Sequence, residues 1–212
     1  QSIKAALAKE DAPTPGLYRE ILKMEVGNTY VVRLLPYTPD PEKTFHQFYT
    51  YGWESFATGN YVQALSPATF GERCPISEER FRLTKNGTQE EKERADKVRR
   101  STKWYVNVYV IDDPKNPDNN GKVKIMRYGK QLEKIIMNAI SGDDADEYGE
   151  RIFDLGPNGV DLKVKVEKQA EYPTYVSSRF ATSKLKLSED QQQEILGGVF
   201  DLTAVDTLKS YE

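Results

Sequence analysis

Side chains that commonly act in catalysis or bind zinc are scarce in this sequence. The chain has one histidine, His46, and one cysteine, Cys74. A Ser–His–carboxylate or Cys–His site would have to use His46, and no nucleophile-elbow or P-loop motif accompanies it. A structural zinc site needs about four cysteine or histidine ligands at close spacing. We therefore assign ordinary structural roles, with His46 in a strand and Cys74 as a small packing residue.

Two pairs of carboxylates offer a second kind of chemistry. Asp112 is followed by Asp113, and Asp143 is close to Asp146. Paired carboxylates can hold the divalent cations that a nuclease uses. Both pairs lie in polar, loop-like segments, where solvated acids are the usual interpretation. A metal-dependent nuclease is therefore the alternative hypothesis, and a function that is not enzymatic is preferred.

Basic and aromatic residues are interleaved between Lys97 and Lys130. This window contains nine basic and three acidic residues, a local charge of +6, whereas the whole chain has a net charge of −3. Binding of single-stranded nucleic acid needs cations for the phosphates and flat aromatic faces for the bases, each stack contributing ~1–3 kcal/mol. Tyr172 and Tyr175, close to Arg179, repeat the combination. The competing interpretation is a solvated face with ordinary strand tyrosines.

Alternating side chains predict the strands that would position these groups. Between residues 104 and 111, valines at every second position form an apolar face, and Tyr105 lies on the opposite face. We therefore expect Tyr105 to point away from the core. After a Pro/Asn/Asp/Gly loop, residues 122–128 complete a hairpin. Its outward face is expected to carry Lys124, Met126 and Tyr128, with Val123 and Ile125 inside.

The remaining pattern predicts a mainly β chain with helical insertions, of the α+β class. Helices are expected at 131–140 and on either side of Gly87, and irregular structure at 54–76. About five strands in this arrangement fit a small Greek-key barrel of the oligonucleotide-binding (OB) type. The predicted organisation is an N-terminal arm at 1–16 followed by a core at 17–212.

Composition limits the class and the compartment. Hydrophobic residues make up 38% and charged residues 30% of the chain, as in ordinary globular proteins. No apolar run is long enough for a membrane span, no secretory signal is recognisable, and a lone cysteine cannot form an internal disulfide. We expect a cytoplasmic protein with no membrane partner. Because the chain begins with Gln1 rather than methionine, we interpret it as a core fragment.

One ordered block of the sequence carries a family resemblance. A basic run precedes an aromatic pair and Asn107, then come Asp113-Pro114, Asn-Gly-Lys-Val at 120–123 and Arg-Tyr-Gly-Lys at 127–130. The block resembles the single-stranded DNA-binding, helix-destabilising proteins of T-even-type bacteriophages, and flanking pieces agree in order over most of the chain. The resemblance implies a single DNA-binding core at 17–212 with a cleft for DNA. The core would consist of a five-stranded OB-fold barrel (about 17–53 and 98–180), an inserted subdomain (about 54–97) and a C-terminal helical segment (about 181–212). The resemblance also implies sequence-nonspecific binding in phage DNA replication, recombination and repair, in the cytoplasm of the infected bacterial host.

The same resemblance assigns cleft roles to individual residues. It implies that Tyr105, Tyr172 and Tyr175 take the places of base-stacking aromatic residues. The arginines that it implies contact phosphates are Arg33, Arg99, Arg100 and Arg127. Met126 stands where the family has a further cleft tyrosine, so one stacking platform is expected to be missing. Simple alternation leaves Arg127 on the inner face unless a bulge or the strand end turns it. With the outward side of the hairpin added, the predicted DNA-binding set is Arg33, Arg99, Arg100, Lys103, Tyr105, Lys124, Met126, Arg127, Tyr128, Lys130, Tyr172 and Tyr175.

The sequence departs from the family at its metal site and at its ends. Family members hold zinc in the inserted subdomain with one histidine and three cysteines, and only Cys74 keeps a ligand. We therefore expect no cofactor and a zinc-free subdomain. The expected partners are single-stranded DNA and, through ends beyond this chain, copies of itself and phage replication proteins. The positions that correspond to the zinc ligands are Tyr51, Ala64 or Leu65, Cys74 and Ser77, and the residues expected to pack the subdomain are Tyr51, Trp53, Phe56, Phe70 and Phe81.

Overall fold

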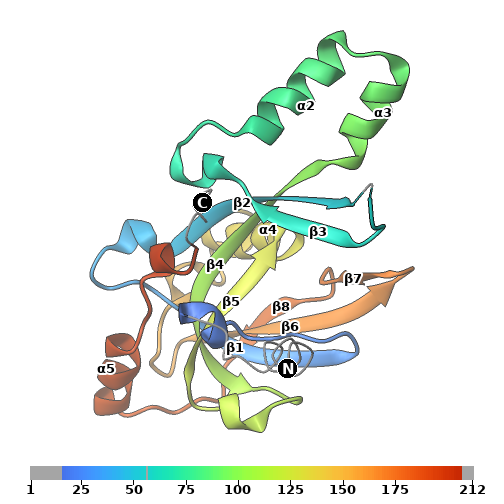
Figure 1. Cartoon of the computed structure of the whole chain (residues 1–212). Helices are drawn as coiled ribbons and strands as arrows, with labels where there is room; N and C mark the ends of the chain where they lie inside the picture. The colour runs from blue at the N-terminus through green and yellow to red at the C-terminus, as the bar shows by residue number, and fades with distance from the viewer. Residues whose placement is uncertain (1–15, 56, 207–212) are drawn as a thin grey trace, which may run out of the picture.

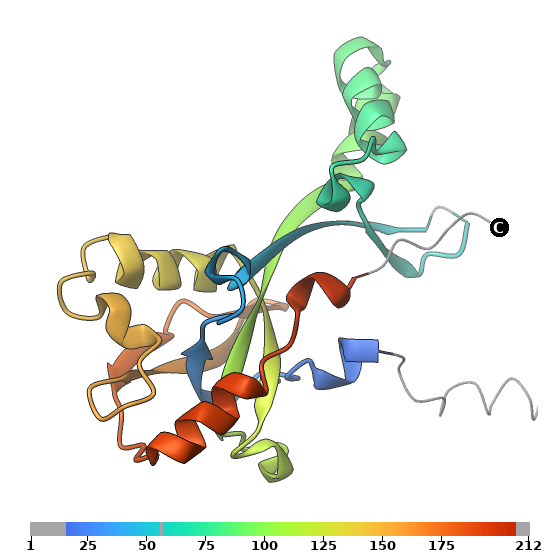
Figure 2. The same ribbon diagram turned by 90° about the vertical axis from the view of Figure 1, so that its left-hand side faces the viewer.

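The computed structural model describes residues 16–55 and 57–206, which form a curled antiparallel sheet, a half-barrel, with four α-helices (Figures 1 and 2). This mixed α and β architecture agrees with the predicted class. The predicted N-terminal arm, apart from Gly16, lies outside the described residues, as do residues 207–212 of the predicted C-terminal segment. Within the described ranges, no helix has both the length and the apolar character needed to cross a bilayer.

The described sheet has eight strands where the sequence pattern predicts about five. The additional strands include short ones, such as Tyr61–Leu65 and Tyr172–Thr174, and an alternating pattern is hard to recognise in so few residues. The strands are β1 (Asn28–Leu35), β2 (Phe45–Glu54), β3 (Tyr61–Leu65), β4 (Arg99–Asp112), β5 (Val123–Gly129), β6 (Val160–Gln169), β7 (Tyr172–Thr174) and β8 (Arg179–Thr182). The α-helices are α2 (Pro75–Asn86), α3 (Gln89–Lys97), α4 (Lys130–Ser141) and α5 (Glu189–Gly197). Short 3-10 helices are η1 (Gly16–Glu20), η2 (Pro41–Lys43), η3 (Pro67–Phe70), η4 (Pro117–Asn119), η5 (Gly149–Ile152) and η6 (Leu202–Ala204).

Strand β4 organises the sheet. The spatial order is β3-β2-β4-β1-β6-β7, with β5 added on β4 and β8 added on β6. All these ladders are antiparallel. The first half of β4 pairs with β2 and the second half with β1, while β5 pairs along its middle. Side chains of β1, β2 and β5, which are far apart in the sequence, therefore lie beside those of β4 on the two faces of the sheet.

The main core is formed by the sheet and helix α4. Val106, Val108 and Val110 alternate into it from β4, and Leu132 and Ile136 come from the apolar face of α4. None of these five side chains is more than 1% exposed. The predicted apolar face at 104–111 and the predicted helix at 131–140 are thereby confirmed.

Strand β5 faces the opposite way from the prediction. Met126 pairs with Val106, and Tyr128 pairs with Trp104. Directly opposed residues of an antiparallel pair share a face, so both side chains enter the main core, where Met126 is 0% and Tyr128 5% exposed. The expectation that Met126 and Tyr128 face outward is wrong. Because Ile125 on the other face is also buried, apolar character alone did not distinguish the two faces.

Helices α2 and α3 form a hairpin that projects from one end of the sheet (Figures 1 and 2). The helices flank Gly87, as predicted, and Thr88 begins α3 with a capping box. Ala95 is the single buried residue that these two described helices contribute. Phe81 is 67% and Phe70 40% exposed, so the expectation that they pack the subdomain is wrong. The hairpin is too thin to enclose large side chains.

Arg33 is a buried residue of the central strand β1. Its Nη2 donates to Oδ1 of Asp161 on β6 at 2.6 Å, and its Nη1 donates to the backbone carbonyl of Asp154. Arg33 is 0% and Asp161 5% exposed. The prediction placed Arg33 on a cleft surface, and this placement is wrong, because a carboxylate on the neighbouring strand neutralises the guanidinium inside the fold. The pair ties β1 to β6 and to the loop that precedes β6.

We expect Arg33→Leu to lower the free energy of unfolding by ~3–5 kcal/mol, because it leaves the Asp161 carboxylate buried without its partner. Urea denaturation measures this loss. The matched variant Arg99→Leu, which removes an exposed arginine of β4, should leave the stability almost unchanged. A fully stable Arg33→Leu protein with weakened DNA binding would instead make Arg33 a contact residue.

Candidate nucleic-acid interface

Three cations lie along one face of the β4–β5 hairpin: Arg99, Lys103 and Arg127, here called the cationic row. Arg99 and Lys103 stand at alternate positions of β4, so they emerge on the same face as Tyr105. Arg127 joins them because it pairs directly with Tyr105 in the β4–β5 ladder. Arg127 is exposed, and no bulge is needed to turn it outward. Arg127 thus shares a face with Arg99 and Lys103 because β5 is oriented opposite to the prediction.

The cationic row has no ion-pair partner among residues 16–55 and 57–206. The Nε of Arg99 donates to the backbone carbonyl of Asp96 at 3.1 Å, which leaves its charge uncompensated. Partial burial lowers the pKa of Lys103, and the like charge of Arg127 lowers it further. Cations that repel each other without a carboxylate between them favour the binding of an anion such as phosphate.

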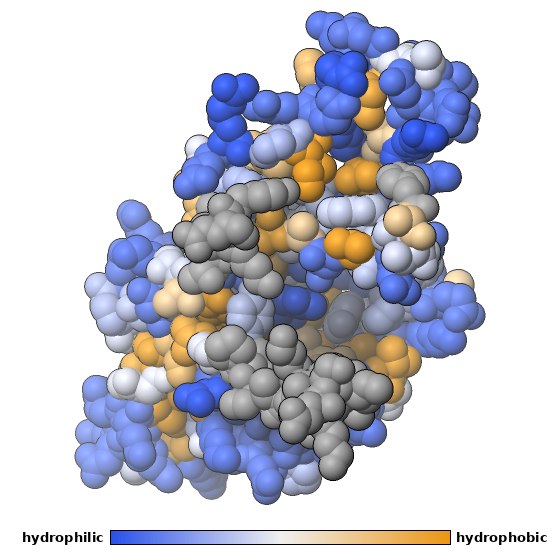
Figure 3. Space-filling view, in the orientation of Figure 1, coloured by the Kyte–Doolittle hydropathy of each residue, from blue (hydrophilic) through white to orange (hydrophobic). Residues whose placement is uncertain are grey.

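The row opens at Arg99 into a cavity of about 780 Å³, here called the mouth cavity. Its walls come from β2, β3, β4 and β7, which are far apart in the sequence. Figure 3 shows this side of the molecule hollowed between the β2–β3 hairpin and the β6–β7 hairpin. The cavity is lined by Gly52, Trp53, Glu54, Ser55, Tyr61, Asp96, Lys97, Arg99 and Tyr172.

Two predicted aromatic residues lie next to the cationic row. Tyr172 is 76% exposed and lines the mouth cavity together with Arg99. Tyr175 is partly buried, which raises its pKa, and the nearby charge of Arg127 acts in the opposite direction. Exposed rings beside unpaired cations are the combination that binds single-stranded nucleic acid. The structure therefore brings together the predicted residues Arg99, Lys103, Arg127, Tyr172 and Tyr175.

Tyr105 is covered, although it points away from the main core as predicted. Its ring stacks on Phe48 with 4.3 Å between centroids and is 1% exposed. Leu202 and Val205 from the end of the described chain close over it. Asn107 holds this C-terminal segment in place, since its side-chain amide donates to the carbonyl and accepts from the N–H of residue 200, at 2.9 and 3.0 Å. The placement of Tyr105 on an open cleft face is wrong, because a distant segment covers that face.

The structure separates three other predicted cations from the row. Arg100 emerges on the opposite face of β4, where its guanidinium lies 4.7 Å from the ring centroid of Tyr49. Lys130 is exposed at the first residue of α4. Lys124 forms an ion pair with Glu20 at 2.8 Å and is largely buried. The local charge of this window is thus divided among several surfaces.

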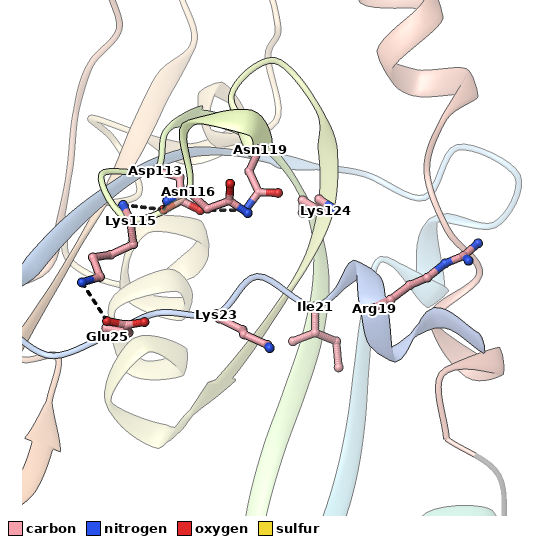
Figure 4. Close-up of a pocket in the computed structure, with 9 residues that line it drawn as sticks. All are labelled: Arg19, Ile21, Lys23, Glu25, Asp113, Lys115, Asn116, Asn119 and Lys124. Carbon is pink, nitrogen blue, oxygen red and sulfur yellow. Dashed lines mark hydrogen bonds and ion pairs between the residues drawn. The ribbon is translucent and has the colours of Figure 1, made fainter. Parts of the chain in front are cut away.

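Asp113 lines a polar pocket at the far end of β4, where its carboxylate accepts several hydrogen bonds (Figure 4). Asp113 is 1% exposed, and its Oδ1 accepts from the backbone N–H groups of Lys115 and Asn116 at 3.0 and 2.9 Å. Its Oδ2 accepts from the side-chain amide of Asn119 at 2.7 Å. These bonds fold the loop between β4 and β5, as an Asx turn does. Asp113 is therefore a structural cap of the hairpin.

The other carboxylates of the nuclease hypothesis are also poorly arranged for catalysis. Asp112 is exposed beside the buried Asp113, and Asp143 and Asp146 are exposed in the loop after α4. Within the described ranges, no three His, Cys, Asp or Glu side chains gather as metal ligands would. A two-metal nuclease site needs several carboxylates that converge on one point. The geometry of these side chains gives the nuclease hypothesis no support.

The positions that correspond to the family's zinc ligands meet at the base of the helical hairpin. Tyr51 pairs with Ala64 in the β2–β3 ladder, and Oη of Tyr51 lies 2.6 Å from Oγ of Ser77. Cys74 is 4% exposed; burial raises the pKa of its thiol, but hydrogen bonds from Ser66 and Ser77 lower it overall. Hydroxyls with one thiol do not fit zinc, which takes thiolates, imidazoles or carboxylates. Of the predicted packing residues, Tyr51 is buried, Trp53 is partly exposed, and Phe56 lies outside the described residues.

Residues of the mouth cavity that sequence reasoning missed come from the β2–β3 hairpin. Tyr61 is 69% exposed, and Trp53 lines the same cavity instead of packing the subdomain. Lys97, the last residue of α3, joins them. Little in the sequence indicates that Tyr61 belongs to a binding site, because it lies in the segment 54–76, for which irregular structure is predicted. Only the pairing of β2 with both β3 and β4 brings it to Arg99.

Unpaired cations beside exposed aromatic rings are an arrangement typical of proteins that bind single-stranded nucleic acid. Comparison with known sequences agrees. The chain belongs to the family described as gp32 DNA binding protein like, which matches residues 27–212. This confirms the resemblance to the phage proteins.

Two phage proteins are similar to the chain over most of its length. It is 28% identical over 193 residues to the single-stranded DNA-binding protein of Enterobacteria phage T4, and equally similar to the protein of the same name from phage T2. The alignment covers 86% of this chain and 62% of each relative. The chain therefore spans less than two thirds of the length of these relatives.

We expect Tyr105→Ala to lower the free energy of unfolding by ~3–5 kcal/mol, because it empties a space between Phe48, Leu202 and Val205. Thermal or urea denaturation measures the loss. Tyr105→Phe keeps the ring and should remain close to wild type, since the hydroxyl contact with Asp206 is long, at 3.4 Å. A stable Tyr105→Ala protein that has lost DNA affinity would restore the base-stacking role.

Proposed function

We propose that this chain binds single-stranded DNA, without sequence preference and without catalysis. The observation that carries the proposal is the cationic row beside exposed rings. Arg99, Lys103 and Arg127 form no ion pair in the described ranges, and Tyr172 lines the mouth cavity together with Arg99. The family match and the printed names of the phage relatives support the same function.

In this proposal the row binds phosphates, while Tyr172 and Tyr175 stack against bases. Both kinds of contact are indifferent to base identity, because each nucleotide has the same phosphate and each base has a flat π face. The base faces are hidden inside a duplex and accessible in a single strand. Preferential binding to the single strand therefore destabilises a helix by mass action.

The biological setting is proposed from the phage relatives. We place the function in replication, recombination and repair of phage DNA, in the cytoplasm of an infected bacterium. Copies of the protein itself and phage replication proteins are the proposed partners. We propose that the half-barrel is an OB-fold barrel and that residues of about 54–97 are its inserted subdomain. The position of α4 between β5 and β6 and the projection of α2 and α3 support this division.

We expect Arg127→Ala to weaken binding to oligo-dT and to reduce the slope of log affinity against log salt by ~0.7, the value for one phosphate contact on a single strand. Fluorescence titrations at several salt concentrations, repeated with duplex DNA, measure both quantities. Arg82→Ala is the matched control, because Arg82 is an exposed arginine of α2 that already pairs with Glu79. Wild-type affinity that is independent of salt would refute the electrostatic site.

We also propose that the inserted subdomain is stable without zinc, supported by the hydroxyl contact between Tyr51 and Ser77 and by the burial of Cys74. A metal-chelating agent should leave the melting temperature unchanged, because no zinc–ligand bonds hold the fold. Elemental analysis of the purified protein should give less than stoichiometric zinc. Stoichiometric zinc, with a lower melting temperature after chelation, would contradict this proposal.

A further inference from the structure

Tyr61 is a large aromatic residue held on the surface of β3. It lines the mouth cavity from the β2–β3 hairpin, and Tyr172 lines the same cavity from β7. Tyr61 is 69% and Tyr172 76% exposed. Single exposed aromatic residues are common and need no explanation by themselves. Two rings from different hairpins that border one cavity with Arg99 call for a functional account.

Gly52 on β2 gives the Tyr61 ring its position. A Cβ at residue 52 would lie 2.7 Å from Cζ of Tyr61 and closer still to its hydroxyl oxygen, so the hydroxyl end of the ring lies against Gly52. Gly52 does not have a positive φ. The missing side chain therefore provides space for the ring and is not needed for the backbone conformation.

The register places this ring beside a cation. Gly52 pairs directly with Arg99 in the β2–β4 ladder, so the end of the ring against Gly52 shares a face with the Arg99 side chain. Lys97 adds a second positive charge to the cavity, and Glu54 and Asp96 add carboxylates. The carboxylates repel further phosphates. The cavity is therefore suited to one flat base with one phosphate on the Arg99 side.

We propose that Tyr61, seated on Gly52, is a base-stacking residue, and that the mouth cavity holds one unpaired base whose phosphate lies on Arg99. The inference rests on the proposed function and names one nucleotide subsite within it. The cavity volume of about 780 Å³ is in the range of pockets that hold small ligands, ~300–1,000 Å³. Tyr172 forms the facing wall of this subsite.

The first test is the affinity for an oligo-dT of about eight nucleotides, a length within the range that one OB fold covers. We expect Tyr61→Ala to weaken binding about tenfold, the loss of one base stack. Tyr61→Phe keeps the flat ring and should bind like wild type. Phe81→Ala is the matched control, because Phe81 is 67% exposed on α2 and does not line the cavity.

The second test asks whether Gly52 acts through Tyr61. Gly52→Ala pushes the hydroxyl end of the Tyr61 ring aside, so it should weaken binding severalfold. The melting temperature should stay close to wild type, because the exposed ring can turn into solvent. In the Tyr61→Ala background the same Gly52→Ala change should have no further effect on affinity. Equal losses in both backgrounds would show that Gly52 does not act by seating the ring.

The outcomes separate this inference from the proposed function. If the wild-type chain does not bind oligo-dT at low salt, the proposed function fails, and the subsite fails with it. If the wild type binds and Arg127→Ala weakens it, but Tyr61→Ala binds like wild type, only the subsite is overturned. Binding that falls with Tyr61→Ala and is kept by Tyr61→Phe supports both.

Discussion

The period of two along strand β4 is the constraint on which the rest of the molecule depends. Val106 and Val108 must enter the main core, so the intervening residues emerge on the other side. The ladders to β1, β2 and β5 hold this register along the strand. A slip of one residue would bring Lys103 into the core and expose the valines, which the apolar face forbids. The spacing of the cationic row is therefore set by the same pairing that builds the core.

Cations that look equivalent in the sequence are used in different ways because their neighbours differ. Arg33 meets Asp161 on the adjacent strand and serves the fold, and Lys124 meets Glu20 and is withdrawn from solvent. Arg127 lies near enough to Lys103 to lower the pKa of Lys103 by charge repulsion. Neither residue forms an ion pair with a carboxylate in the described ranges. Unpaired like charges disfavour the isolated protein slightly and favour a bound anion. The site is thus defined as much by the lack of ion-pair partners among the described residues as by the bases present.

Hydroxyl and thiol side chains hold the base of the helical hairpin. Tyr51 and Ser77 form a hydroxyl contact, and Cys74 is buried beside them. Such a contact contributes ~1 kcal/mol. The hairpin gains its local order from Gly87 and from the capping box at Thr88, which depend on neighbouring residues only. The anchoring at its base and the local caps together replace a large core.

Much of the architecture was predictable, because it follows from short-range patterns. The alternation of valines gave β4, the apolar spacing gave α4, and Gly87 divided the helical hairpin. The ordered block around these elements was enough to reveal the family. Composition and local charge also located the basic window that contains Arg99, Lys103 and Arg127.

Only the tertiary structure decided which face of each strand is open. Tyr105 is covered because Asn107 binds residue 200, which is 93 positions further along the chain. Both faces of β5 are buried in part, so the apolar pattern there could not distinguish them, and Met126 and Tyr128 were assigned to the wrong side. Tyr61 reaches Arg99 only through the pairing of β2 with two other strands. The sequence by itself determined the elements and the chemistry available, whereas coverage by distant segments, which no local pattern encodes, determined which side chains a ligand can reach.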